Sequence, residues 1–222
     1  MVHSPQLKEQ WEHFERQQYR RAFVKTFAVR RQLRDVDLHD AYRLMGLACH
    51  HQQQYHQATL WLKKACQGSS DPGDWCNLAA SATMQGNSQL GAEAFEQVRI
   101  CQQAAKYQAD PGFYWQLSWY ASALCDAEEH ARLQPLLDEL AGVYERLHCT
   151  DTTFLYIRRV PFLSSFLALA GRCLGSPERS SEGVAWLQEF GRKLDKEGQS
   201  QVGEVVQRLR DIAESPAVAH DH

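Results

Sequence analysis

The chain has 222 residues, of which 44% are hydrophobic and 10% aromatic, enough for one large globular domain or two small ones. Its 24 Lys and Arg against 27 Asp and Glu give a formal net charge of −3, which provides no general argument for a nucleic-acid or anionic membrane partner. No run is apolar for the length of a membrane-spanning helix, and the start, MVHSPQLKEQ, lacks the apolar core of a secretory signal. We therefore expect a soluble, cytoplasmic protein.

Helix signals dominate the whole chain. Hairpin dipeptides and sustained alternation of β-branched with polar residues are nearly absent, which argues against strands. Breaks rich in Gly, Pro and Ser at 68–74, 86–88, 109–112 and 175–181 separate stretches of helical length. Short connections of this kind join antiparallel helix pairs. The sequence predicts an all-α fold.

The first predicted element, residues 1–37, is a basic and aromatic helix that caps the rest. Large apolar side chains recur along it at short helical intervals: Leu7, Trp11, Phe14, Tyr19, Phe23 and Phe27. Seven basic residues and no acidic one lie between 16 and 34: Arg16, Arg20, Arg21, Lys25, Arg30, Arg31 and Arg34. This basic patch is either a dock for nucleic acid, anionic lipid or an acidic partner, or the solvated face of a cap. The aromatic residues favour the second interpretation, in which the helix is a structural cap and the basic side chains lie on its solvated face.

The next stretch contains two copies of one pattern. The first copy runs Tyr42, Met45, Gly46, Cys49, Tyr55, Ala58, Leu62, Ala65 and then Asp71-Pro72. The second runs Trp75, Leu78, Ala79, Ala82, a turn at Gly86-Asn87, and then Gly91, Phe95 and Val98. The interval from Gly46 to Ala58 recurs between Ala79 and Gly91. This pattern resembles the tetratricopeptide repeat.

The resemblance implies a right-handed superhelix, an α-solenoid, of antiparallel helix pairs. Each crossing demands close backbone approach, so Gly46 and Ala58 are expected to mark the contact between two helices. A third copy, which begins at Tyr114 after a longer interval, gives three hairpins over 38–147. We expect a divergent fourth hairpin and C-terminal capping helices at 148–214, with Pro161 starting or kinking a helix. A disordered tail is expected at 215–222.

In tetratricopeptide proteins, the first helices of successive hairpins line a concave groove that binds a peptide or helix. Carried onto this sequence, the groove residues are Arg43, Leu47, His50, His51, Cys76, Asn77, Ala80, Met84, Trp115, Gln116 and Trp119. They are mostly apolar or aromatic, which suits a partner's amphipathic helix or apolar peptide. Repeat domains that hold the acidic end of heat-shock chaperones use a clamp of basic and amide side chains. Only Arg43 and Asn77 match it, so that role is disfavoured.

The seven cysteines indicate a reducing environment. They form no C-x-x-C pair, and their odd number cannot all be closed into disulfides within the chain. We expect free thiols that pack as small hydrophobes. Cys49, His50, His51 and His56 crowd one helix end and turn, unlike the paired spacings of structural zinc sites. No metal and no cofactor is predicted.

The sequence is compatible with two functions, and neither of them is catalytic. No phosphate loop, nucleophile elbow or zinc-protease motif is present, so we predict no enzyme. The favoured function is an adaptor, scaffold or chaperone-like module whose partner is another protein rather than nucleic acid or membrane. The alternative is a regulatory or sensor module of a transcription or signalling system that contacts nucleic acid or anionic lipid through the basic N-terminal helix. Six acidic residues against Arg132 between 126 and 145 leave self-association with the basic end open.

Overall fold

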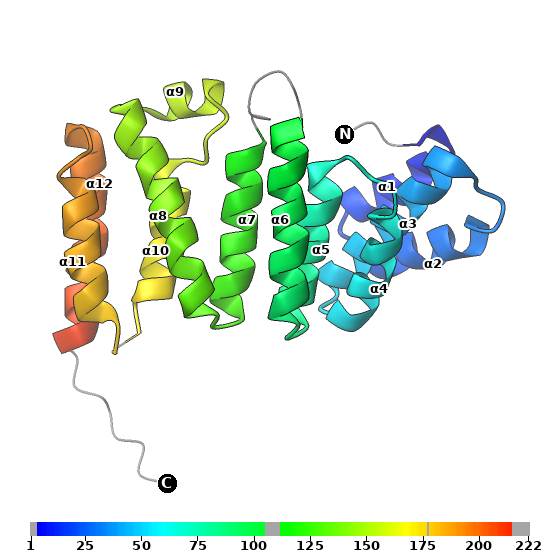
Figure 1. Ribbon diagram of the computed structural model, residues 1–222, viewed down its shortest axis with the longest axis horizontal. Coiled ribbons are helices and arrows are strands. Elements are labelled where there is room, and N and C mark those ends of the chain that lie inside the picture. The colour runs from blue at the N-terminus through cyan, green and yellow to red at the C-terminus, as the bar shows by residue number, and fades with distance from the viewer. Residues whose placement is uncertain (1–3, 105–111, 177, 215–222) are drawn as a thin grey trace, which may run out of the picture. The chain divides into compact units, whose positions relative to one another are not determined.

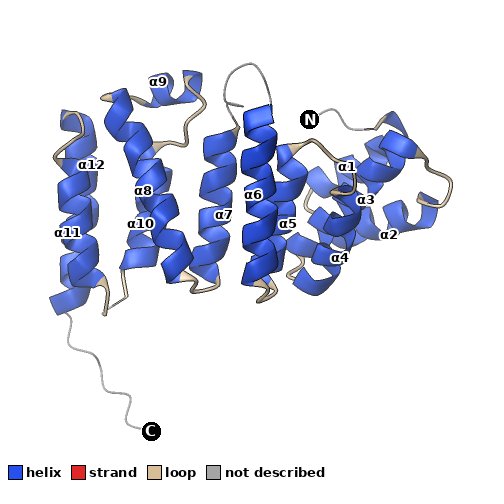
Figure 2. Cartoon of the chain, in the orientation of Figure 1, coloured by secondary structure: helices blue, strands red, loops and turns tan. Residues whose placement is uncertain are grey.

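The computed structural model describes residues 4–104, 112–176 and 178–214 (Figures 1 and 2). Within these ranges the chain forms one 3-10 helix and twelve α-helices and no strand, which confirms the all-α prediction. No helix in the described ranges is long and apolar enough to cross a membrane. The predicted disordered tail, 215–222, lies outside the described residues.

The chain divides into two compact units, Met1–Asp110 (unit 1) and Pro111–His222 (unit 2). Unit 1 contains η1 (Pro5–Leu7), α1 (Lys8–Glu15), α2 (Tyr19–Val29), α3 (Asp35–His51), α4 (Tyr55–Ala65), α5 (Pro72–Met84) and α6 (Ser88–Ala104). Within it α3 packs along α4 and α5 along α6, and α4 also packs against α5. The helices of unit 1 thus follow one another in space as they do in sequence.

The N-terminal segment forms two α-helices, not the single helix expected. Gln17 adopts a left-handed φ of 59° between α1 and α2, and the chain reverses there. Leu7 and Trp11 lie in a buried cluster with Leu33 and Leu44, which joins this segment to α3.

Glycines mark the close helix contacts of unit 1. A Cβ on Gly46 would lie 2.5 Å from Cγ of Leu62, and one on Gly91 would overlap the hydroxyl of Thr83. The two predicted crossings are therefore both present. The atoms nearest to a Cβ on Gly46 belong to Leu62, which lies one turn after Ala58 in α4. The branched Leu62 side chain fills the space that the missing Cβ leaves.

Unit 2 contains α7 (Phe113–Asp126), α8 (His130–Leu147), α9 (Thr152–Ile157), α10 (Leu163–Leu174), α11 (Ser180–Gly191) and α12 (Lys196–Glu214). Helix α7 pairs with α8 and α11 pairs with α12, while α10 packs against α7, α8 and α12. The sequence predicts a fourth hairpin of α10 with α11, but α11 packs more extensively against α12 than against α10. Pro161 lies before α10, so it precedes the helix instead of kinking it.

Two cysteines correct the expectation of free thiols. Cys125 of α7 and Cys173 of α10 form a disulfide, with Cα atoms 5.6 Å apart. They are 48 residues apart in sequence, and only the packing of α10 on α7 brings them together. Five cysteines are free, and burial raises the pKa of Cys49 to about 11 and that of Cys76 to about 12. Such thiols are poor nucleophiles near neutral pH.

Candidate partner-binding grooves

An open groove of about 520 Å³ lies in unit 2 between α7 and α10, here called the α7/α10 groove. Its lining is Trp115, Ser118, Trp119, Ser122, Ser165, Ala168, Leu169 and Arg172. Trp115 and Trp119 are one helical turn apart on α7 and are 45% and 42% exposed. Two large aromatic side chains on one wall of a groove are an apolar surface of the kind that binds a partner.

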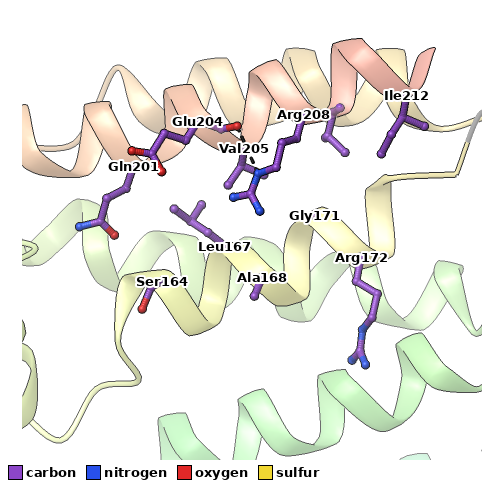
Figure 3. A pocket seen from close by; sticks show the side chains of 11 residues that line it. Ser164, Leu167, Ala168, Gly171, Arg172, Gln201, Glu204, Val205, Arg208 and Ile212 are labelled. Atoms are coloured by element: carbon purple, nitrogen blue, oxygen red, sulfur yellow. Dashed lines mark hydrogen bonds between the residues drawn. The ribbon is translucent and has the colours of Figure 1, made fainter. Parts of the chain in front are cut away.

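A second groove of about 430 Å³ lies on the other side of α10, against α12, and is called the α10/α12 groove. Figure 3 shows Leu167 and Val205 on facing helices, with Ile212 towards the end of α12. Ile212 is 43% exposed. Because Ala168 and Arg172 line both grooves, the two form one surface that runs over α7, α10 and α12.

Two arginines and one carboxylate, Glu204, are the charged side chains that line this surface. Arg172 pairs with Asp126 at 3.0 Å and donates to the hydroxyl of Ser122 at 2.8 Å, so its charge is partly neutralised. Arg208 is exposed, and its Nε donates to the backbone carbonyl of Glu204 at 3.4 Å in its own helix (Figure 3). Since no carboxylate of the described residues pairs with it, Arg208 is the cation of this surface most available to an acidic group.

Arg43, expected in the groove of unit 1, is instead 6% exposed. Its Nε donates to Asp74 at 2.6 Å, and Nη2 donates to Asp71 at 2.9 Å. Asp74 is fully buried and accepts further hydrogen bonds from Arg43 at 3.0 Å and from Ser69 at 2.6 Å. The guanidinium therefore ties α3 to the start of α5, and its charge is not available to a partner.

The other groove residues predicted in unit 1 differ in exposure. Ala80 is fully buried and Cys76 is 3% exposed, whereas Leu47, Asn77 and Met84 are half-buried.

The two adjacent histidines of α3 are engaged within unit 1. His50 Nδ1 lies 2.8 Å from the hydroxyl of Ser81, and burial, aided by the charge of His51, lowers the pKa of His50 to about 4. The ring of His51 stacks on Tyr19 at 4.7 Å, and burial lowers its pKa too. Among the described residues, no group of three or more His, Cys, Asp and Glu could hold a metal ion.

The predicted groove residues fall into both units. Trp115, half-buried Gln116 and Trp119 belong to unit 2, and the rest belong to unit 1. Sequence reasoning missed the walls that α10 and α12 contribute, such as Leu167 and Arg208. The apolar periodicity of α10 and α12 was visible, but it could not show which faces remain uncovered.

The structure also shows the contacts of the acidic cluster at 126–145. Among the acidic residues of 126–145, Asp126 pairs with Arg172, Glu145 with Lys193 at 3.3 Å, and Asp138 accepts from Trp186 at 2.8 Å. At least two of the six carboxylates are therefore ion-paired inside unit 2, whereas the hydrogen bond from Trp186 leaves the negative charge of Asp138 in place.

Comparison with protein-family models, with curated proteins and with solved structures finds no match to this chain.

Proposed function

We propose that the chain is a non-catalytic protein-interaction module of tetratricopeptide type, an adaptor or chaperone-like protein that binds an apolar helix or peptide of another protein. The observation that carries the proposal is the pair of exposed tryptophans, Trp115 and Trp119, on one wall of the α7/α10 groove. Large aromatic side chains with few rotamers are common anchors of protein interfaces. The helix pairs, and the glycines at Gly46 and Gly91 where helices touch, support the repeat architecture.

The groove also suggests the chemistry of the partner segment. The exposed Ala168 and Ile212 continue the apolar surface beyond the tryptophans, above the buried Leu167 and Val205, which suits an amphipathic helix laid over α10. The exposed Arg208 at its edge favours an acidic side chain next to the partner's apolar residues. A partner held mainly by clamped carboxylates is disfavoured, because Arg43 is engaged by Asp71 and Asp74.

Two further properties belong to this proposal. We place the protein in the cytoplasm, because five free cysteines suit a reducing compartment, in which the bridge between Cys125 and Cys173 would open. We also propose that the module works without a bound cofactor.

The test selects peptides from a displayed random library on the wild-type chain and measures their affinity by calorimetry for wild type, Trp115→Ala and Trp119→Ala. Loss of a true anchor should weaken binding by at least about 2 kcal/mol, roughly thirtyfold. Because both side chains are more than two-fifths exposed, thermal unfolding should change little.

Tyr156→Ala is the matched control, since Tyr156 is a 72% exposed aromatic of unit 2 that lines neither groove. Its affinity should equal that of wild type. Peptides that bind both tryptophan variants as tightly as wild type, or tryptophan variants that unfold early, would show that the groove is not the binding site.

A further inference from the structure

The surface of unit 1 formed by α2 and α4 combines cations with exposed aliphatic side chains. Its members, here called the basic face, are Arg20, Arg21, Val24, Phe27 and Arg31 from α2 and the turn after it, and Leu60, Lys63 and Lys64 from α4. All eight are exposed. The sequence pointed to the cations of the first segment, but α4 enters only through the fold.

Aromatic contacts join the two helices. Trp61 of α4 contacts Phe23 and Phe27 of α2, with ring centroids 6.4 Å and 6.1 Å apart. Both helices also pack against α3 (Figure 1). The exposed side chains that flank these rings therefore border one continuous patch.

The patch is positive because its cations lack carboxylate partners. Arg16 and Lys25, elsewhere in the basic segment, pair with Glu12 and Glu9. In contrast, Arg20, Arg21, Arg31, Lys63 and Lys64 pair with no carboxylate of the described residues. Neither 16–34 nor 41–70 contains an acidic residue, and of the acids between these segments Asp40 is buried and Asp37 accepts from Ser4. Two exposed acids border the patch: Asp35 at the start of α3, and Glu9 of α1, which pairs with Lys25.

Apolar side chains stand among these cations. Val24 is 57% exposed, Leu60 51% and Phe27 40%. Arg20, Val24, Phe27 and Arg31 follow one another at intervals of four, three and four residues, so they lie along one side of α2 and the turn that continues it. Aliphatic side chains held out between unpaired cations are typical of protein surfaces that rest in the headgroup region of a membrane.

We propose that the basic face binds the surface of an anionic lipid bilayer, with Val24, Phe27 and Leu60 entering the headgroup region and the cations contacting lipid phosphates and carboxylates. Single-stranded nucleic acid fits less well, because it needs free aromatic faces for base stacking. Here the guanidinium of Arg30 lies 3.3 Å from the centroid of Phe27, and the ammonium of Lys64 lies 4.6 Å from that of Trp61. Val24 and Leu60 are aliphatic and cannot stack on a base. The inference is independent of the groove proposed above, which lies in unit 2.

The experiment is vesicle flotation of the full chain with phosphatidylcholine vesicles, with and without phosphatidylserine. Binding should require phosphatidylserine and fall as salt is raised, because exposed charges are screened. Lys63→Glu with Lys64→Glu should lower partitioning at least about 25-fold, since each cation near an anionic surface contributes about fivefold. The control Lys196→Glu with Arg210→Glu, two exposed cations of α12, makes the same change in net charge and should bind as wild type.

A second pair of variants tests the aliphatic side chains. Val24→Ser with Leu60→Ser should lower partitioning about tenfold without changing net charge. Tyr156→Ser with Ile157→Ser, at residues 72% and 69% exposed in unit 2, should have no effect. Equal melting temperatures of all variants would show that the fold is intact.

Three results would overturn the proposal. These are no flotation of wild type with either vesicle, equal flotation of wild type and the Lys63/Lys64 variant, or flotation that is insensitive to the Val24/Leu60 change. A fluorescent single-stranded oligonucleotide is titrated in parallel. Binding of that probe, lost in the Lys63/Lys64 variant while wild type ignores vesicles, would assign the basic face to nucleic acid instead.

Discussion

The two units of this chain hold their helices together with different chemistry. In unit 1, α3 is tied to α5 by a buried guanidinium, Arg43, whose partners Asp71 and Asp74 lie 2.9 Å and 2.6 Å away. In unit 2, the rings of Tyr144, Phe166 and Phe190 pack together, with the centroid of Phe166 5.2 Å from that of Tyr144 and 5.5 Å from that of Phe190. The first arrangement is polar and requires a specific hydrogen-bond geometry. The second is apolar, and its stability depends on how closely the rings pack.

This difference shows why a charged residue on the expected inner side of a helix is weak evidence for a ligand. Arg43 has the position of a ligand-binding cation, yet its charge is used inside unit 1. The exposed groove side chains of unit 2, Trp115 and Trp119, are aromatic and resemble core residues in the sequence. In both units, the exposure that the fold leaves to a side chain decides whether it can contact a ligand.

The largest effect should follow from breaking the buried ion pairs. Arg43→Ala leaves the fully buried Asp74 without its main partner, and we expect the free energy of unfolding to fall by about 3–5 kcal/mol. Arg172→Ala in unit 2 removes an arginine that is 51% exposed and should cost less than about 1 kcal/mol. Urea unfolding of both variants measures the contrast. Equal losses would mean that the buried network does not distinguish the two units.

Reduction should weaken unit 2 and leave unit 1 unchanged. The bridge between Cys125 and Cys173 closes a loop of 48 residues, and its loss should cost about 2–4 kcal/mol. Hydrogen exchange before and after reduction should show faster exchange in α7 and α10, with α3 and α5 as the internal control. Seven reactive thiols in air-oxidised, denatured protein would contradict the bridge itself.

Acid should act through unit 1. Burial lowers the pKa of His50 from 6.5 to about 4, so the unfolded chain binds a proton more readily than the folded chain. The free energy of unfolding is therefore highest above pH 6.5. It falls by on the order of 2–3 kcal/mol as the pH is lowered towards 4. His50→Gln should flatten the dependence of unfolding free energy on pH in this window. An unchanged slope in that variant would assign the dependence to other groups.

Local signals made part of this fold predictable. Asp71-Pro72 begins α5, where the Asp71 side chain accepts from the backbone N–H of Gly73 at 2.8 Å, and Gly86 follows α5 with a left-handed φ of 86°. Residues one turn apart share a helix face, which is why the common position of Trp115 and Trp119 could be predicted.

The contacts that the sequence did not reveal join distant residues. Arg43 and Asp74 are 31 residues apart, and Cys125 and Cys173 are 48 apart. Both pairs depend on which helix packs against which. The same holds for the α10/α12 groove, because α11 pairs with α12 and thereby determines the face of α10 that stays open.

The smallest effect tests how closely the helices of unit 1 approach each other. Gly46→Ala would place a Cβ 2.5 Å from Cγ and 2.8 Å from Cδ2 of Leu62, both in a fully buried side chain. Overpacking of this kind should lower the unfolding free energy by about 1–3 kcal/mol, even though alanine favours helix. Gly203→Ala in α12 of unit 2 meets nothing within 4 Å and should stabilise by up to about 1 kcal/mol. Opposite signs for two identical substitutions, measured by thermal unfolding, would assign the effect to the crossing of α3 and α4 rather than to backbone flexibility. If Gly46→Ala also stabilises, the two helices are not in close contact at Gly46.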